Sequence, residues 1–191
     1  ADLELFILDT RQYRSLNTDP DGPDKTMLGS AQLQWLLDGL AQSTATWKVI
    51  ATSVPLSIPK GKGTTGRGFD GWAGGLDGTG FERERQILVE AILTRHLKNV
   101  VFLAGDVHYV QANVYDPNGD GVTDFHEFVA GPLSAAQGRM TLPNPTLKPT
   151  TLIHEGGYYN FGLVRVTPSS FDVTVVDEKG VSRFTHHLSA Q

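Results

Sequence analysis

The stretch that decides the fold is Val100-Val101-Phe102-Leu103-Ala104-Gly105-Asp106-Val107-His108-Tyr109. Its first half is apolar, β-branched and aromatic, which predicts a buried parallel strand. Asp106 and His108 stand two positions apart, so an extended backbone would send both side chains to the same face. A carboxylate beside an imidazole suits zinc, iron, manganese or calcium. The alternative is that both residues only end the strand.

The residues before this stretch alternate between strand and helix patterns. Strands are expected at residues 3–8 and 47–52, a first helix over the leucines that follow Ser30, and a second helix at residues 82–97. Ser30 is the expected N-cap of the first helix, whose apolar stripe is formed by Leu33, Leu36, Leu37 and Leu40. Residues 1–109 therefore predict a β-α-β-α-β unit with right-handed crossovers and parallel strands.

Parallel strands present their carboxyl ends at one edge of a sheet, where ligands of open α/β sheets bind. Polar residues follow each of the three strands, so we expect them to converge there. They are Asp9, Arg11 and Tyr13 after the first strand, Thr52 and Ser53 after the second, and Asp106 and His108 after the third. This convergence favours a ligand role for Asp106 and His108 over a strand-ending role.

Residues 110–191 show the two-residue period of antiparallel strands. We expect strands at residues 110–115, 125–130, 161–166, 171–176 and 181–187, the last three forming a meander. Residues 60–80, rich in glycine, and residues 137–157, rich in proline, predict long irregular loops. The chain is thus an α/β protein in which a β-α-β-α-β unit precedes an antiparallel meander.

Composition excludes several functional classes. The 191 residues are 39% hydrophobic and 19% charged, which is typical of a globular domain. A formal net charge of −5 argues against nucleic acid as a recognition partner. The sequence contains no apolar run long enough for a membrane span. The absence of cysteine excludes disulfides and thiolate metal ligands.

Residues 116–127 match the oxygen-donor spacing of a calcium loop. The donors are Asp116, Asn118, Asp120, Asp124 and Glu127, with Gly121 at the sixth position. The flanking residues predict strands rather than helices, so the loop is not an EF-hand. The two open interpretations are a structural calcium site and a simple hairpin tip, since Asp, Asn and Gly also favour turns.

Basic residues near the predicted edge offer contacts for an anion. Residues 61–68 do not match a phosphate-binding P-loop, because no helix follows directly. Lys60, Lys62 and Arg67 could still meet an anionic substrate. Arg11 has two open interpretations: a phosphate contact, or a structural pair in which Asp9 binds Arg11 or Arg14.

Several blocks occur in an order that resembles the C-terminal half of the alkaline phosphatase D (PhoD-like) metallophosphoesterases. They are residues 8–14, 26–36, 47–50, 70–73, 99–109, 128–133 and 159–162. The resemblance implies half of a four-layer α/β/β/α sandwich with a two-metal site between its sheets. Iron and calcium are the metals it implies, with zinc or manganese as alternatives. Asp106 would ligate one metal and His108 the other.

The resemblance also implies what the enzyme does and what this chain lacks. Family members are usually exported, to the periplasm or outside the cell, and hydrolyse phosphate monoesters or diesters; some are phospholipase D-type enzymes. The other metal ligands, a bridging Asp and an Asn among them, belong to an N-terminal half that is not in these residues. We therefore expect that half as a separate or cleaved polypeptide, without which this chain would be inactive.

The resulting interpretation is a phosphoesterase whose catalytic residues here are Arg11, Asp106 and His108, acting on a phosphate ester. The alternative from another class is a noncatalytic calcium-binding β-rich module that needs only the loop at residues 116–127. A further alternative is an inactive fragment that serves as an interaction subunit.

Overall fold

The computed structural model describes residues 1–60, 68–74 and 78–191. Its larger sheet has six strands in the order β1-β2-β3-β5-β4-β6. The first four are parallel to one another, and β4 is antiparallel to both of its neighbours. The strands are β1 (Leu3–Ile7), β2 (Trp47–Ala51), β3 (Val100–Ala104), β4 (Val110–Tyr115), β5 (Phe125–Val129) and β6 (Pro149–Glu155). The predicted β-α-β-α-β unit is confirmed.

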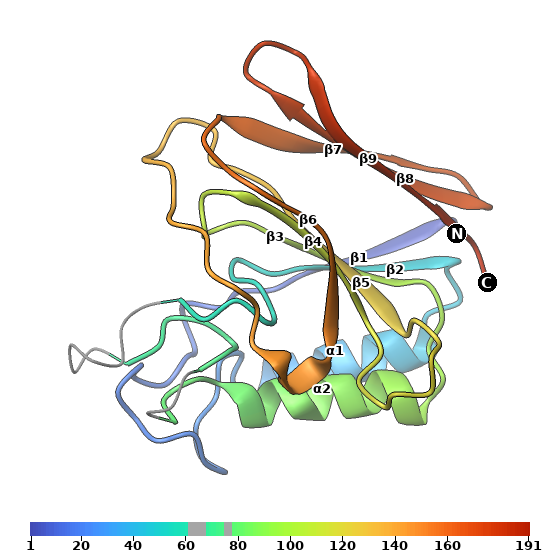
Figure 1. Ribbon diagram of the computed structural model, residues 1–191. Helices are drawn as coiled ribbons and strands as arrows, with labels where there is room; N and C mark the ends of the chain where they lie inside the picture. The colour runs from blue at the N-terminus through green and yellow to red at the C-terminus, as the bar shows by residue number, and fades with distance from the viewer. Residues whose placement is uncertain (61–67, 75–77) are drawn as a thin grey trace.

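Two helices cover one face of this sheet (Figure 1). They are α1 (Ser30–Gln42) and α2 (Glu82–Thr94). The main apolar core lies between this face and the helices. It contains strand residues, among them Phe6, Ile50, Phe102 and Phe125, and helix residues, among them Leu36, Leu40, Leu88 and Ile92. The apolar stripe of α1 therefore packs as its helical spacing predicted.

The helix ends differ from the sequence prediction in detail. Gly29, not Ser30, is the N-cap of α1, and its φ of 74° lies in the left-handed region that glycine adopts without a steric cost. The second helix ends at Thr94 rather than at residue 97. His96 has a φ of 51°, which a continuing α-helix does not allow.

A three-stranded antiparallel sheet covers the opposite face, as Figure 1 shows. Its strands are β7 (Asn160–Val166), β8 (Ser170–Asp177) and β9 (Ser182–Ser189), so the predicted meander is confirmed. Trp47 joins the two sheets: its ring lies 5.3 Å from that of Phe171, and its indole Nε1 donates to the carbonyl of Thr167 at 2.9 Å. The chain thus forms a helix layer and two packed sheets.

The remaining strands extend the first sheet instead of forming a separate antiparallel one. The β4–β5 hairpin folds back so that β5 lies between β3 and β4 and pairs in parallel with β3. Residues 149–155, within a stretch predicted to be irregular, form β6 at the sheet edge and pair with β4. A short 3-10 helix, η2 (Pro145–Leu147), leads into this strand. Within the described residues, no helix has the length and apolarity needed to cross a membrane.

Candidate active site

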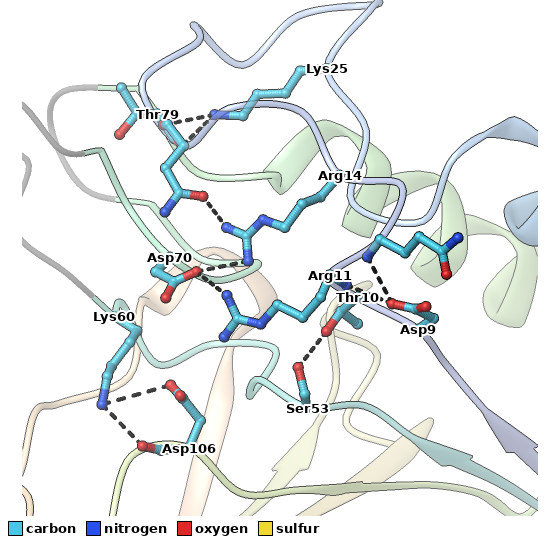
Figure 2. A network of polar contacts seen from close by, with 12 residues as sticks. Asp9, Thr10, Arg11, Arg14, Lys25, Ser53, Lys60, Asp70, Thr79 and Asp106 are labelled. Carbon is cyan, nitrogen blue, oxygen red and sulfur yellow. Dashed lines mark hydrogen bonds and ion pairs between the residues drawn. The ribbon is translucent and has the colours of Figure 1, made fainter.

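The carboxyl ends of β1, β2 and β3 meet at one edge of the large sheet (Figure 2). Thr10, after β1, is buried, and its hydroxyl hydrogen-bonds to the hydroxyl of Ser53, after β2. Lys60 and Asp106 meet at the same edge. The structure therefore brings Thr10 and Ser53 into contact and places Arg11 and Asp106 nearby, as Figure 2 shows.

Asp106 follows β3 in a conformation that the sequence did not predict. Its φ is 71° and that of His108 is 64°, so the backbone here is left-handed and the predicted extended chain is wrong. Non-glycine residues rarely adopt this region, and such strain is typical of functional sites. Lys60 Nζ donates to the carbonyl oxygen of Asp106 at 3.0 Å and lies 3.7 Å from its carboxylate Oδ2. That Oδ2 atom is buried and accepts no hydrogen bond from the described residues.

The imidazole of His108 is oriented by the segment that follows β5. Its Nδ1 atom hydrogen-bonds to the carbonyl oxygen of Ala136, which can only accept, so Nδ1 carries the proton. The backbone N–H of Gly138 donates to the carbonyl of His108 at 3.0 Å. A Cβ at position 138 would lie 1.9 Å from the carbonyl oxygen of Val107, so only glycine fits. No described residue forms a hydrogen bond with the second ring nitrogen, Nε2, which is therefore the candidate ligand atom.

Asp106 and His108 fit the chemistry of a metal site. A buried carboxylate oxygen without a hydrogen-bond partner is costly unless a cation satisfies it. An imidazole whose other nitrogen donates to a carbonyl is the usual arrangement of a metal-binding histidine. The described residues contain no group of three or more His, Asp or Glu side chains that could hold a metal. These two residues are therefore an incomplete ligand set.

Arg11 is held by Asp70, a contact that sequence reasoning missed. Its guanidinium donates to Asp70 Oδ1 at 2.7 Å, and Arg14 lies 2.7 Å from the same oxygen. Burial would raise the pKa of Asp70, but the hydrogen bonds and charges of both arginines lower it below its ordinary value. The carboxylate of Asp9 instead accepts the backbone N–H groups of Arg11 and Gln12, which lower its pKa. Arg11 and Arg14 thus form their ion pairs with Asp70, and not with Asp9 as one of the two sequence interpretations proposed.

The loop predicted to bind calcium lies at the tip of the β4–β5 hairpin. Asp116 accepts backbone N–H groups from Gly119, Asp120 and Gly121, as an Asx turn does. Asn118 donates to Asp120 at 3.0 Å. Burial, followed by the charges of Asp120 and Asp116, raises the pKa of Asp124, so these carboxylates repel one another.

Glu127 does not belong to this loop, and its prediction as a calcium ligand is wrong. Strand alternation turns its side chain to the helix-covered face, where it is fully buried. There its carboxylate accepts hydrogen bonds from the backbone N–H of Leu56, the hydroxyl of Tyr115 and the amide of Asn113. Burial raises the pKa of Glu127, which these hydrogen bonds oppose.

Asp70 and Ala136 were missed by sequence analysis for the same reason: each is far along the chain from the residue that it contacts. Asp70 lies 59 positions from Arg11, and Ala136 lies 28 positions from His108. No short-range spacing connects such pairs; only the block at residues 70–73, noted for its resemblance, pointed to Asp70. Lys62 and Arg67 lie outside the described residues.

Comparison with known proteins identifies relatives of this chain. The family model for PhoD-like phosphatases matches residues 1–175. Alkaline phosphatase D of Bacillus subtilis (strain 168) is 37% identical over 115 residues, covering 53% of this chain and 18% of that protein. The matched part of this chain therefore covers less than a fifth of the length of that relative.

Solved structures support the same fold. A structure of PhoD matches with a TM-score of 0.68 and 24% identity, covering 98% of this chain and 38% of that one. Purple acid phosphatase PPD1 from yellow lupin (Lupinus luteus) seeds matches with a TM-score of 0.55 and 13% identity, covering 84% of this chain and 28% of that one. The fold is that of part of a metallophosphoesterase sandwich. Since the family match extends over most of its length, the chain belongs to the PhoD-like phosphatase family.

Proposed function

We propose that this chain is the C-terminal part of a metal-dependent enzyme that hydrolyses phosphate monoesters or diesters. Membership of a phosphatase family supports phosphoester hydrolysis as the reaction class. Two observations support metal dependence. The buried Oδ2 of Asp106 accepts no hydrogen bond from the described residues, with Lys60 Nζ 3.7 Å away, and the Nδ1 atom of His108 is held by the carbonyl of Ala136. Asp106 and His108 both follow β3 at the edge that Arg11 also reaches.

In this proposal the residues at the sheet edge have different roles. Asp106 and His108 would each hold a metal, for which iron and calcium are the proposed identities and zinc or manganese the alternatives. When bound, metals at this position would supply the Lewis acidity that activates water and neutralises phosphoryl oxygens. Arg11, 51% exposed at its side chain, is positioned to donate hydrogen bonds to a phosphoryl oxygen. Lys60 holds the backbone of Asp106 and adds a positive charge at the same edge.

An N-terminal half on another segment would complete this site. Strand β1 is at the end of its sheet, and its Leu5 and Ile7 side chains are 48% and 69% exposed. Such an edge favours pairing with a further strand. Phe161 and Leu163 of β7 are also exposed, which favours a covering layer on the second sheet. We propose that the partner supplies the remaining ligands, and that the assembled enzyme acts in the periplasm or outside the cell.

Replacement of the two ligands tests this proposal in the assembled protein, meaning this chain together with its proposed N-terminal half. The variants are Asp106→Asn and His108→Gln. Asp172→Asn and His187→Gln are matched controls, since these two residues form a 2.6 Å pair on β8 and β9. Metal content and hydrolysis of p-nitrophenyl phosphate and bis(p-nitrophenyl) phosphate are measured.

The site variants should lose bound metal and at least about a hundredfold in activity, while the controls keep both. The relative rates with the two substrates assign the monoesterase or diesterase class, and a phosphatidylcholine substrate tests phospholipase D-type activity. Unchanged metal content and activity in Asp106→Asn would contradict the proposal and favour the noncatalytic alternative.

The second candidate, a calcium-binding β-rich module, rests on the hairpin tip. Burial, followed by the charges of Asp120 and Asp116, raises the pKa of Asp124, which indicates repulsion at this carboxylate. A structural calcium held by these residues and Asn118 would relieve that repulsion. This function is compatible with the first, because the tip and the candidate active site do not share residues.

A further inference from the structure

We infer that Asp70, anchored by the buried Arg14, is a positioning residue that fixes the guanidinium of Arg11 for a substrate phosphoryl group. This inference rests on the proposed function, because it names the residues that prepare Arg11 for its phosphate contact. Figure 2 shows Asp70 between the two arginines, with Lys60 and Asp106 nearby.

Arg14 is the fixed member of this group. Its side chain is only 9% exposed, and its guanidinium carbon lies 5.0 Å from the centre of the fully buried Phe81 ring. A guanidinium over an aromatic face is stabilised by the ring electrons. Arg14 also donates to the side-chain carbonyl of Asn17. Its position is therefore set by packing with the residue that precedes α2.

Asp70 is fixed by its own segment as well as by Arg14. Its backbone N–H donates to the carbonyl of Lys60 at 2.6 Å. Two residues later, Trp72 is 1% exposed, and its indole Nε1 donates to the hydroxyl of Thr52 at 3.1 Å. The segment that carries Asp70 is thus attached to the end of β2, the strand beside β1.

Arg11 is consequently held at both ends. Its backbone N–H donates to Asp9 Oδ1 at 2.8 Å, and its guanidinium donates to Asp70 Oδ1 at 2.7 Å. Half of its side chain is exposed, so guanidinium donors remain for a ligand. Among the described residues, Arg11 and Arg14 both form their ion pair with the single carboxylate of Asp70.

This arrangement predicts the sign of an Asp70 substitution. If Asp70 positions Arg11, its loss releases a flexible side chain that a phosphate must order again, and substrate binding weakens. If Asp70 instead competes with phosphate for Arg11, its loss strengthens binding. The two roles therefore move KM in opposite directions.

The test is a double-mutant cycle of Asp70→Asn and Arg11→Ala in the assembled protein, with p-nitrophenyl phosphate as substrate. Asp70→Asn should raise KM about five- to twentyfold and change kcat by less than about threefold. In the Arg11→Ala background, Asp70→Asn should change KM by less than about twofold, because the residue through which it acts is absent. Asp70→Glu should recover part of the loss, and Asp172→Asn, a paired aspartate on β8, should have no effect.

A guanidinium NMR measurement of Arg11 gives a readout independent of turnover. Rotation of the Arg11 guanidinium should be restricted in the parent protein and in Asp172→Asn, and fast in Asp70→Asn. A lowered KM, equal KM effects in both backgrounds, or unchanged rotation would overturn the inference. If Arg11→Ala leaves KM unchanged while rotation still depends on Asp70, the phosphate role proposed for Arg11 fails, and with it Asp70's role in substrate binding; only its hold on Arg11 survives.

Discussion

The buried carboxylate of Glu127 accepts a hydrogen bond from the backbone N–H of Leu56 at 2.6 Å. Arg85 Nη1 donates to the carbonyl of the same residue, also at 2.6 Å, so the N–H and the carbonyl of Leu56 are both bound by buried ionisable side chains. Leu56 lies between Ser53 and Lys60, which the same segment carries to the candidate active site. Glu127 and Arg85 thereby fix the position of the segment from Ser53 to Lys60 at the sheet edge.

Substitution of Glu127 tests how much this contact stabilises the fold. Glu127→Ala should reduce the free energy of unfolding by roughly 3 kcal/mol, because it removes the acceptor of the Leu56 N–H and of the Tyr115 hydroxyl. Glu127→Gln should cost less, since its carbonyl can still accept from Leu56. Urea denaturation measures both; an Ala variant as stable as the parent would show that the contact contributes little.

His126 should make stability depend on pH. It lies on β5 at the interface of the two sheets, where its ring is 6.0 Å from that of His186 on β9. Burial, with a smaller contribution from His186, lowers the pKa of His126 from 6.5 to about 4. The unfolded chain therefore binds a proton more readily than the folded one. The free energy of unfolding is therefore unaffected by protonation of His126 above about pH 6.5 and decreases as the pH falls toward about 4.

The variant His126→Phe isolates this effect, because phenylalanine keeps a ring but cannot take up a proton. The parent should lose roughly 2 kcal/mol more than the variant between pH 7 and pH 4.5, as measured by urea denaturation at each pH. Parallel pH profiles for the two proteins would show that His126 is not the titrating group.

Gly39 should resist replacement although it lies inside a helix. Alanine ordinarily stabilises a helix by about 1 kcal/mol relative to glycine. A Cβ at position 39 would lie 2.6 Å from the ring of Phe6, which is itself buried between α1 and the sheet. Gly39→Ala should therefore lower stability by about 1–3 kcal/mol.

A second substitution identifies the cause of this loss. Phe6→Leu should itself be destabilising but should make Gly39→Ala less costly, because the smaller side chain leaves room for the Cβ. Gln34→Ala, at an exposed position of α1, is the control and should change stability little. A stabilised Gly39→Ala variant would contradict the packing argument.

Calcium should bind at the hairpin tip if the carboxylates there form a site. Calcium at about ten times its dissociation constant should stabilise the protein by about 1.4 kcal/mol, measured by thermal unfolding. Asp124→Asn should reduce this shift, while Asp38→Asn, on the exposed face of α1, should leave it unchanged. If calcium stabilises neither the parent nor the variants, the loop is a simple turn that binds no cation.

The sequence by itself determined the elements whose signal is local. The leucine stripe predicted α1, the apolar runs predicted β1, β2 and β3, and their order predicted the shared edge that carries Arg11 and Asp106. The alternation in residues 161–187 likewise predicted the meander. Each of these signals is contained within a few turns or one strand, where side-chain periodicity follows directly from backbone geometry.

Only the tertiary structure decided contacts between distant segments. It placed β5 beside β3, paired β6 with β4, turned Glu127 into the core and brought Asp70 to Arg11. It also gave Asp106 and His108 left-handed backbones where the sequence predicted an extended chain. These features depend on which surfaces pack together and on the partners that buried polar groups then find. Local sequence patterns do not indicate which distant residues come into contact, so the pairing of residues 11 and 70 is evident only in the folded chain.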